Sequence, residues 1–275
     1  MSPAETRHFF LTRPTHFRIE YSINHWMNKN NQVEPEKAEA QWNALLENYR
    51  SLGAKVEVFE SVNGWPDQVF TGDSIFLYGK HAIAGRFRYP ERSGEVLPMV
   101  ERFEQRGYTI HQVPDGLFFE GNGEAIAWDG RILGGYGVRS DRKALDFLAK
   151  TLDLEVIPLR VLPPHFHVDT IVCPLRENLL AYVPSGMDEE SQQRIESLGV
   201  DLIAIDQDEA QNLACNSMAL GDDLIFSTHN APKFHKRLEE AGFKVMPLDL
   251  REFAKSGGGA KCLTLEAYKA NTTVQ

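Results

Sequence analysis

Cys262 follows a run of three glycines (257–259) and the basic residue Lys261. Glycine allows a backbone to approach a ligand closely. The thiolate is the reactive form of cysteine, and an adjacent positive charge lowers the pKa of the thiol. Cys262 is therefore a candidate nucleophile, with a small buried apolar side chain as the alternative. That structural role is the one we expect for Cys173 and Cys215.

The segment 164–169, Pro-His-Phe-His-Val-Asp, offers a partner for such a nucleophile. His167 and Asp169 would point to one face if the segment were a strand. A catalytic cysteine and its histidine are usually distant in sequence and adjacent in the fold. His165, His167 and Asp169 could instead bind a metal ion, although no fourth ligand is evident nearby. A purely structural histidine is the third alternative.

Acidic and basic side chains recur in three further segments. Glu120 lies in FFEGNGE, where it is either a solvated loop charge or a buried acid, and its aromatic neighbours favour the buried acid. Asp67 and Asp73 belong to WPDQVFTGD, where a single aspartate is commonly a turn residue or a helix cap. Arg92 and Arg139 lie in polar, glycine-containing segments and are by default surface residues.

A repeated unit along the chain must position these residues. An amphipathic helix, a turn and a β-rich run occur five times, starting near residues 42, 99, 144, 191 and 234. Four of the helices are closed by a glycine, which favours a left-handed end: Gly53, Gly107, Gly199 and Gly242. Asp153 takes this place in the third copy, although aspartate tolerates the conformation less well.

A second apolar hairpin follows each β-rich run and starts with a polar residue: Asp73, Glu124, Asp169, Asn216 and Cys262. Residues typical of hairpin turns occur at 78–80, 129–131 and 221–222. The fifth copy lacks its returning strand, which residues 7–14 could supply. The sequence thus predicts a closed ring of five related α/β modules, with an ordinary α/β domain as the alternative.

Equivalent residues of modules related by rotation would converge near the common axis. Three carboxylates, one amide and one thiol would then face the same centre. Clustered carboxylates repel one another, and burying them unpaired is costly. We therefore expect a bound cation to relieve both problems at this centre.

Composition limits the kinds of protein that this chain can be. It has 275 residues, 42% of them hydrophobic and 25% charged, as in a globular protein. We expect one catalytic domain over 1–275, with a flexible tail from about residue 269. Lys plus Arg is 29 and Asp plus Glu is 39, so the formal net charge is −10. This charge argues against a nucleic-acid partner and favours cationic small molecules.

No apolar run approaches the roughly 18 residues of a membrane span, and the first residues do not have the layout of a signal peptide. Three cysteines without a CxxC spacing argue against a disulfide scaffold or a structural zinc site. We expect a cytoplasmic protein that has no membrane partner.

As a set, four segments resemble the guanidine-modifying (pentein) superfamily, which includes arginine deiminase, dimethylarginine dimethylaminohydrolase and glycine amidinotransferase. These segments are PDxVFxxD, FEGxG(D/E), HxDT and the ending GGGAKCLTL. The resemblance spans nearly the whole chain and keeps the order of the family. It implies a five-bladed α/β propeller of ββαβ modules, in agreement with the repeats.

The resemblance also implies catalytic roles for three residues. Cys262 would attack the guanidinium carbon and form a covalent thiouronium adduct. His167 would protonate the departing amine and then deprotonate the hydrolytic water. Glu120 would position the cation and His167. No metal and no cofactor are implied.

Substrate-binding roles follow from the same resemblance. Asp73 and Asp169 would hold the guanidinium nitrogens through charge-assisted hydrogen bonds, which keep the group protonated. The bound cation would in turn favour the thiolate of the nucleophile. Arg92 and Arg139 would hold the substrate α-carboxylate, with Asp67 near the amino-acid end.

Three positions bear on the choice of reaction. Lys261 stands where several members of the superfamily have His, and Glu124 replaces the Asp of the commoner EGGD pattern. Arginine dihydrolases of the branch that the chain resembles tend to have Asn at the position of Asp73. The Asp here favours a single hydrolysis without a second cut to ornithine.

The sequence therefore predicts a cysteine hydrolase of guanidino C–N bonds that converts arginine or an N-methylated arginine to citrulline plus ammonia or an alkylamine. Amidinotransfer and arginine dihydrolysis are the alternatives. A non-catalytic propeller, such as the ribosome anti-association factor of this fold, would lack the Cys, His and carboxylates that are present here. The sequence does not fix the guanidino substrate, and a homodimer is a further expectation.

Overall fold

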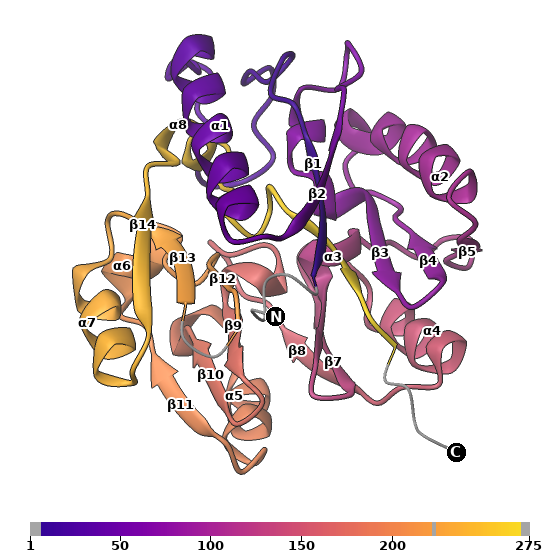
Figure 1. Ribbon diagram of the computed structural model, residues 1–275. Helices are drawn as coiled ribbons and strands as arrows, with labels where there is room; N and C mark the ends of the chain where they lie inside the picture. The colour runs from indigo at the N-terminus through magenta and orange to yellow at the C-terminus, as the bar shows by residue number, and fades with distance from the viewer. Residues whose placement is uncertain (1–6, 222–223, 271–275) are drawn as a thin grey trace.

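The computed structural model describes residues 7–221 and 224–270. It is an α/β structure in which five helices lie at the periphery and the strands lie inside (Figure 1). These helices are α1 (Pro35–Ser51), α2 (Val96–Glu104), α4 (Arg142–Leu152), α5 (Glu189–Glu196) and α7 (Pro232–Glu240). Most of the tail that we expect to be flexible, residues 271–275, lies outside the described part of the chain.

Four copies of the repeated unit follow one another along the chain. In each copy two antiparallel strands are followed by a helix and a third strand, which pairs parallel to the second. The copies are β3 (Ile75–Tyr78), β4 (His81–Ala84), α2 (Val96–Glu104) and β5 (Thr109–Gln112); β6 (Ala125–Trp128), β7 (Arg131–Tyr136), α4 (Arg142–Leu152) and β8 (Val156–Arg160); β9 (Val172–Arg176), β10 (Leu179–Tyr182), α5 (Glu189–Glu196) and β11 (Asp201–Ala204); and β12 (Met218–Ala219), β13 (Leu224–Thr228), α7 (Pro232–Glu240) and β14 (Lys244–Leu248).

The fifth copy combines the two ends of the described chain. β15 (Leu265–Tyr268) pairs antiparallel with β1 (His8–Thr12), which in turn pairs parallel with β2 (Lys55–Phe59) after α1 (Pro35–Ser51). β1 therefore supplies the returning strand, as the sequence predicts. β15 also pairs parallel with β3, which joins two copies in one six-stranded sheet.

The turns that end the helices and hairpins have the expected backbone conformations. Gly53, Gly107, Gly199 and Gly242 all have positive φ angles after their helices. Asp153 also adopts the left-handed conformation, with φ 52°. Asp153 therefore gives its helix end the same left-handed geometry as the four glycines, at the steric cost that a side chain brings there.

The sequence predicts that a polar residue begins each inner hairpin. In the structure these residues instead lie in short turns that precede the strands. Asp73 belongs to η3 (Thr71–Ser74), Glu124 ends α3 (Gly121–Glu124) and Asp169 belongs to η5 (Val168–Thr170). Cys262 lies in a turn before β15. Other short helices are η2 (Pro66–Val69), η4 (Pro90–Glu95), η6 (Pro184–Gly186), α6 (Gln207–Gln211) and α8 (Arg251–Ala254).

The apolar core lies between the strands and the peripheral helices. Along α1 the buried side chains recur at helical spacing, with Trp42, Leu45 and Tyr49 fully buried and Leu52 partly buried. Apolar burial of this kind is the main force that holds each helix against its sheet. Among the described residues, no helix is long and apolar enough to cross a membrane.

The aromatic cluster around β1 gives a direct test of the fifth copy. Phe10 is fully buried, with ring centroids 5.4 Å from Phe59 and 4.9 Å from Phe103. We expect Phe10→Ala to lower the free energy of unfolding by about 3–5 kcal/mol, because it leaves a cavity between the fifth copy and the copy that contains Phe103. Leu97→Ala, at a side chain that is 63% exposed, is the control and should cost no more than about 0.5 kcal/mol in denaturant unfolding. Equal effects of the two substitutions would contradict this account of the core.

Candidate active site

Residues from six separated segments line a narrow buried pocket. Its charged and sulfur-containing lining residues are Asp67, Asp73, Arg92, Arg139 and Cys262. Ile23, Asn24, Met27, Phe70, Phe166 and residues 256–258 complete the wall. Three predicted site residues adjoin this lining through side-chain contacts: Glu120, His167 and Asp169. The structure thus brings all eight predicted site residues together.

His167 and Glu120 form a fully buried pair. The His167 Nε2 atom lies 2.8 Å from Oε2 of Glu120, which also accepts a hydrogen bond of 2.9 Å from Arg139. Burial alone would lower the pKa of His167, but the carboxylates of Asp73 and Glu120 raise it to about 9. Burial opposes the ionisation of Glu120, yet Arg139 and His167 lower its pKa to about 2. At neutral pH the pair is an imidazolium bound to a carboxylate, so His167 holds a proton that it can donate.

The sulfur of Cys262 is held by side chains from two other copies of the unit. Asn216 Nδ2 donates to Cys262 Sγ at 3.1 Å, and the thiol donates to Asp169 Oδ2 at 3.2 Å. The backbone N–H of Cys262 donates to the Asn216 side-chain oxygen. Burial, followed by the charges of Asp169 and Asp73, raises the pKa of Cys262 well above its ordinary value. Without a bound cation, Cys262 is therefore a neutral thiol.

Besides both carboxylate oxygens of Asp67, two buried carboxylate oxygens in the site have no hydrogen-bond partner among the described residues. They are Oδ1 of Asp73 and Oδ1 of Asp169. The first lies 3.8 Å from Nδ1 of His167, too far for a hydrogen bond. Burial raises the pKa of Asp169 to about 6, although the charge of His167 opposes this. Buried acceptors without donors are costly, so the site is suited to a ligand that supplies several N–H groups.

Arg92 and Arg139 are buried and not on the surface, which is their default position from sequence. Arg92 donates to Asp73 Oδ2 at 2.6 Å and to both carboxylate oxygens of Glu95 at 2.9 and 2.8 Å. Arg139 bonds Glu120 and the main-chain oxygen of Ile23. Each partner carboxylate offsets the cost of burying a guanidinium, which is why these arginines can lie inside.

Asp67 is buried in the same wall, in η2. Its main-chain oxygen accepts a hydrogen bond of 3.1 Å from Arg92. Burial raises the pKa of its carboxyl, whereas the charge of Arg92 and the hydroxyl of Tyr21 lower it. A turn residue of this kind, held inward by a buried arginine, is available to a ligand in the pocket.

Glycine is required where two turns meet behind His167. A Cβ atom at Gly123 would lie 2.7 Å from His167 Nδ1 and 2.9 Å from Asp73 Oδ1. Any side chain at this position would therefore displace the imidazole or the carboxylate. This contact gives a physical reason for the second glycine of the segment FEGNGE.

Some contributing residues carry no assigned role in the sequence prediction. Glu95 forms a two-bonded ion pair with Arg92, and Asn216 holds both the sulfur and the backbone N–H of Cys262. Glu124 accepts from the backbone N–H groups of Ser140 and Val168, and burial raises its pKa to about 8. Asn216 aligns with Asp73 and Asp169 in the repeat, and this alignment is the sequence signal that could have identified it. Nothing in the sequence singles out Glu95.

The segment of His167 and Asp169 is not a strand, so the condition under which both side chains would point to one face is not met. His167 precedes η5 and Asp169 lies within it, because the chain makes a helical turn before β9. His165 packs near the indole of Trp26, with ring centroids 6.0 Å apart. Among the described residues, no group of three or more His, Cys, Asp and Glu side chains is arranged to hold a metal ion. Cys173 and Cys215 are buried, in line with the structural role expected for them.

Comparisons with known proteins show the family to which the chain belongs. A family model described as N,N dimethylarginine dimethylhydrolase, eukaryotic, matches residues 8–269. The bifunctional arginine dihydrolase/ornithine cyclodeaminase ArgZ of Synechocystis is 37% identical over 268 residues, which make up 95% of this chain and 38% of ArgZ. The N(G),N(G)-dimethylarginine dimethylaminohydrolase of Mycobacterium tuberculosis is 33% identical over 264 residues, or 96% of this chain and 86% of that protein.

A solved structure extends these similarities to the fold. The product-bound N-terminal domain of ArgZ, an arginine dihydrolase from cyanobacteria, superposes with a TM-score of 0.91 at 34% identity and covers 96% of this chain and 98% of that domain. These matches define the class as an α/β protein similar to dimethylarginine dimethylaminohydrolases and to arginine dihydrolases. Within that class, the chain belongs to the dimethylarginine dimethylaminohydrolase family. It spans only about 38% of the length of ArgZ.

Proposed function

We propose that this protein is a cysteine-dependent hydrolase of guanidino C–N bonds, which converts arginine or an N-methylated arginine to citrulline plus ammonia or an alkylamine. The observation that carries the proposal is the pair of unpartnered buried oxygens, Oδ1 of Asp73 and Oδ1 of Asp169, beside a thiol and a protonated histidine. A planar guanidinium offers N–H donors to both carboxylates. The membership of the family and the similarity to ArgZ support this choice of ligand.

Binding of the cation activates the nucleophile. In the empty site, burial and the charges of Asp169 and Asp73 hold Cys262 as a thiol. A guanidinium between these carboxylates offsets their negative charge, so the pKa of the thiol falls and its proton can leave by way of Asp169 to solvent. The enzyme thus forms its reactive thiolate mainly when substrate is bound.

His167 then serves both halves of the reaction. Thiolate attack on the guanidinium carbon forms the C–S bond, and the imidazolium gives its proton to the nitrogen that leaves as ammonia or an alkylamine. The neutral imidazole next takes a proton from water, which attacks the thiouronium carbon. The C–S bond breaks, Cys262 leaves as a thiolate, and the ureido product loses its remaining proton to solvent. Glu120 keeps His167 oriented throughout.

The remainder of the pocket would bind the amino-acid end of the substrate. Arg92 and Arg139 are assigned to the α-carboxylate and Asp67 to the vicinity of the amino group. Both arginines line the pocket and already form ion pairs, which fix the directions of their remaining N–H groups. Aromatic rings of Tyr89 and Phe166 lie 4.8 and 4.9 Å from the Arg139 guanidinium and hold it in place.

The proposal also covers the architecture and setting of the enzyme. The five units would close as a five-bladed α/β propeller forming a single catalytic domain over 1–275, located in the cytoplasm.

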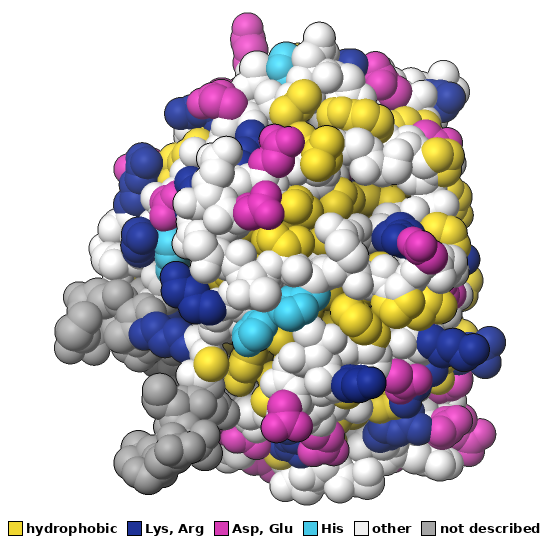
Figure 2. All heavy atoms as spheres, turned by 90° about the vertical axis from the view of Figure 1, so that its right-hand side faces the viewer, with side chains coloured by type: hydrophobic (Ala, Val, Ile, Leu, Met, Phe, Trp, Pro, Cys, Tyr) yellow, Lys and Arg dark blue, Asp and Glu magenta, His cyan; other side chains and the backbone are white. Residues whose placement is uncertain are grey.

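For the proposed homodimer, the face on the side of α2 and β5 offers apolar side chains between charged ones (Figure 2), and Leu97 of α2 is exposed there. Light scattering of the purified protein and of Leu97→Glu would test this contact.

A second candidate, arginine dihydrolysis to ornithine, is favoured by the 37% identity to ArgZ. The two activities differ in products. We expect wild-type protein to release one ammonia per arginine and to accumulate citrulline, because the acidic Asp73 favours a single hydrolysis. Amino-acid analysis of timed reactions measures this ratio, and ornithine with two ammonia per arginine would establish the dihydrolase. Asp73→Asn, which keeps the shape of the side chain, is the matched variant, in which we expect ornithine to rise.

A panel of guanidino compounds defines the substrate and separates hydrolysis from transfer. Arginine, monomethylarginine and dimethylarginine should each yield citrulline, with ammonia, methylamine or dimethylamine as the second product. An amidinotransferase would instead form guanidinoacetate from arginine and glycine. Guanidinoacetate in place of citrulline would replace the hydrolase assignment, and turnover of none of these compounds would refute it.

A further inference from the structure

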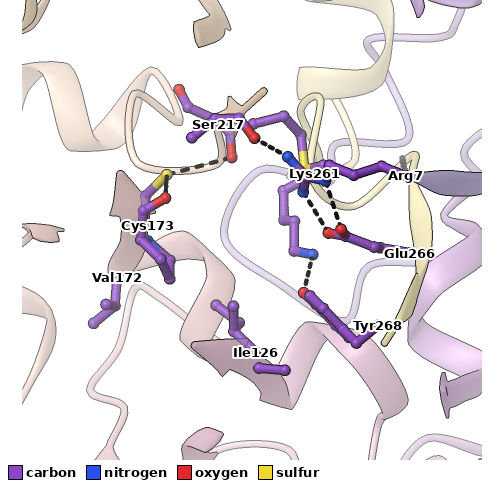
Figure 3. A pocket seen from close by; sticks show the side chains of 12 residues that line it. Arg7, Ile126, Val172, Cys173, Ser217, Lys261, Glu266 and Tyr268 are labelled. Carbon is purple, nitrogen blue, oxygen red and sulfur yellow. Dashed lines mark hydrogen bonds and ion pairs between the residues drawn. The ribbon is translucent and has the colours of Figure 1, made fainter. Parts of the chain in front are cut away.

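Lys261 lies in the wall of a second pocket, although the next residue, Cys262, lines the candidate active site. Figure 3 shows this pocket, with Lys261, Arg7, Glu266 and Tyr268 on one side and Cys173 among the residues on the other. Its interior volume is about 60 Å³. A single water molecule needs about 10–15 Å³ by the same measure. The pocket therefore has room for a small ion or a few waters, but not for an amino acid.

One of the two cations in this pocket is neutralised within the protein. The Arg7 guanidinium donates from Nε and one terminal nitrogen to the two carboxylate oxygens of Glu266, at 2.7 and 2.6 Å. Its other terminal nitrogen bonds the main-chain oxygen of Ala219. This two-bonded pair uses the carboxylate that lines the pocket.

The other cation, Lys261, lacks such a partner. Its side chain is only 6% exposed, and its ammonium donates to the Tyr268 hydroxyl at 2.8 Å. Within 7–221 and 224–270, no carboxylate lies within ion-pair distance of this ammonium. Burial lowers the pKa of Lys261, but Tyr268 and the more distant carboxylates of Glu266 and Asp169 outweigh burial and raise it. Burial raises the pKa of Tyr268, so the hydroxyl is a neutral partner. An ammonium has three donors, so two remain for a ligand.

Among the charged side chains that line the pocket, the two cations Arg7 and Lys261 exceed the one carboxylate, Glu266, by one charge. A bound anion would give the Lys261 ammonium the direct counter-charge that it lacks. The apolar part of the lining, which includes Ile126, Val172 and Met218, favours a weakly hydrated ion over a strongly hydrated one.

We propose that this pocket binds a small monovalent anion, such as chloride or a carboxylate of the size of formate, through the free N–H donors of the Lys261 ammonium. The Tyr268 hydroxyl fixes the direction of the ammonium. This site is separate from the guanidino pocket and does not depend on the proposed function.

Thermal unfolding without substrate tests the proposal. We compare sodium chloride with sodium gluconate at constant ionic strength, because gluconate is too large for the pocket. Wild-type protein should show a saturable rise in Tm of about 2–4 °C with chloride. Lys261→Met should lose the chloride-specific rise. The matched control Lys233→Met, at an exposed lysine, should keep it.

Crystals soaked in bromide provide the structural readout. An anomalous peak at hydrogen-bond distance from Lys261 Nζ is expected in wild-type protein and should be absent in Lys261→Met. Because each comparison of salts is made within one variant, a loss of overall stability in Lys261→Met does not obscure the result. An equal or non-saturable chloride response in both proteins, or no bromide at Lys261, would overturn the proposal.

Discussion

Cys262→Ser is expected to lower kcat by a factor of roughly 10⁴–10⁶, to the background of the assay, while the protein stays folded. A serine hydroxyl has a much higher pKa than a thiol, so binding of a guanidinium between Asp73 and Asp169 cannot ionise it. The hydrogen bond from Asn216 can be kept by the new oxygen. Steady-state citrulline formation and the unfolding midpoint are measured together.

Cys215→Ala is the matched control for this substitution. Cys215 is also buried and next to Asn216, but its sulfur lies 4.0 Å from the main-chain oxygen of Ala181 and makes no close polar contact with a site residue within the described part of the chain. It should retain turnover within a few fold. If Cys262→Ser kept substantial activity, or if both cysteine variants lost it equally, the assignment of the nucleophile would be wrong.

Glu120→Gln is expected to lower kcat by about 10²–10⁴ and to change its pH dependence. The carboxylate of Glu120 helps raise the pKa of His167 to about 9. Its replacement by an amide removes that charge, so the pKa of His167 falls. The alkaline limb of kcat, which reports loss of the proton that His167 donates, should move from near pH 9 to lower pH.

The sign of the effect on stability follows from the same shift. His167 has a higher pKa in the folded protein than its ordinary value of 6.5, so its contribution is fully present below about pH 6.5. That contribution is lost as pH rises through about 9. Glu120→Asp, which keeps the charge but shortens the side chain, should restore part of the alkaline limb. An unchanged limb in Glu120→Gln would show that His167 is not the acid.

The repeats made most of the fold predictable because their signals are local. Helix ends such as Gly107 and Gly242 and the strand of residues 7–14 follow from turn chemistry and apolar periodicity, and the structure has each of them. The exact start of a strand was not predictable where a short helical turn precedes the strand, as at Asp169. Such turns depend on the packing of neighbouring copies, which no single segment encodes.

The residues of the candidate site could also be predicted from the sequence, but the burial of their charges and their ion-pair partners could not. Arg92 and Arg139 are buried because each meets a carboxylate 19 residues earlier in the chain, at Asp73 and Glu120. Separate segments do not reveal such pairs. The partner role of Glu95 and the unpaired oxygen of Asp169 likewise appear only when the segments are assembled.

A crystal structure of Cys262→Ser soaked with arginine would test the central assignment most directly, because it stops the reaction with the pocket still formed. The guanidinium should donate hydrogen bonds to Oδ1 of Asp73 and Oδ1 of Asp169, with its carbon facing residue 262 and its α-carboxylate near Arg92 and Arg139. Arginine bound in the reverse direction, or bound elsewhere with both Oδ1 atoms still unpaired, would contradict the account.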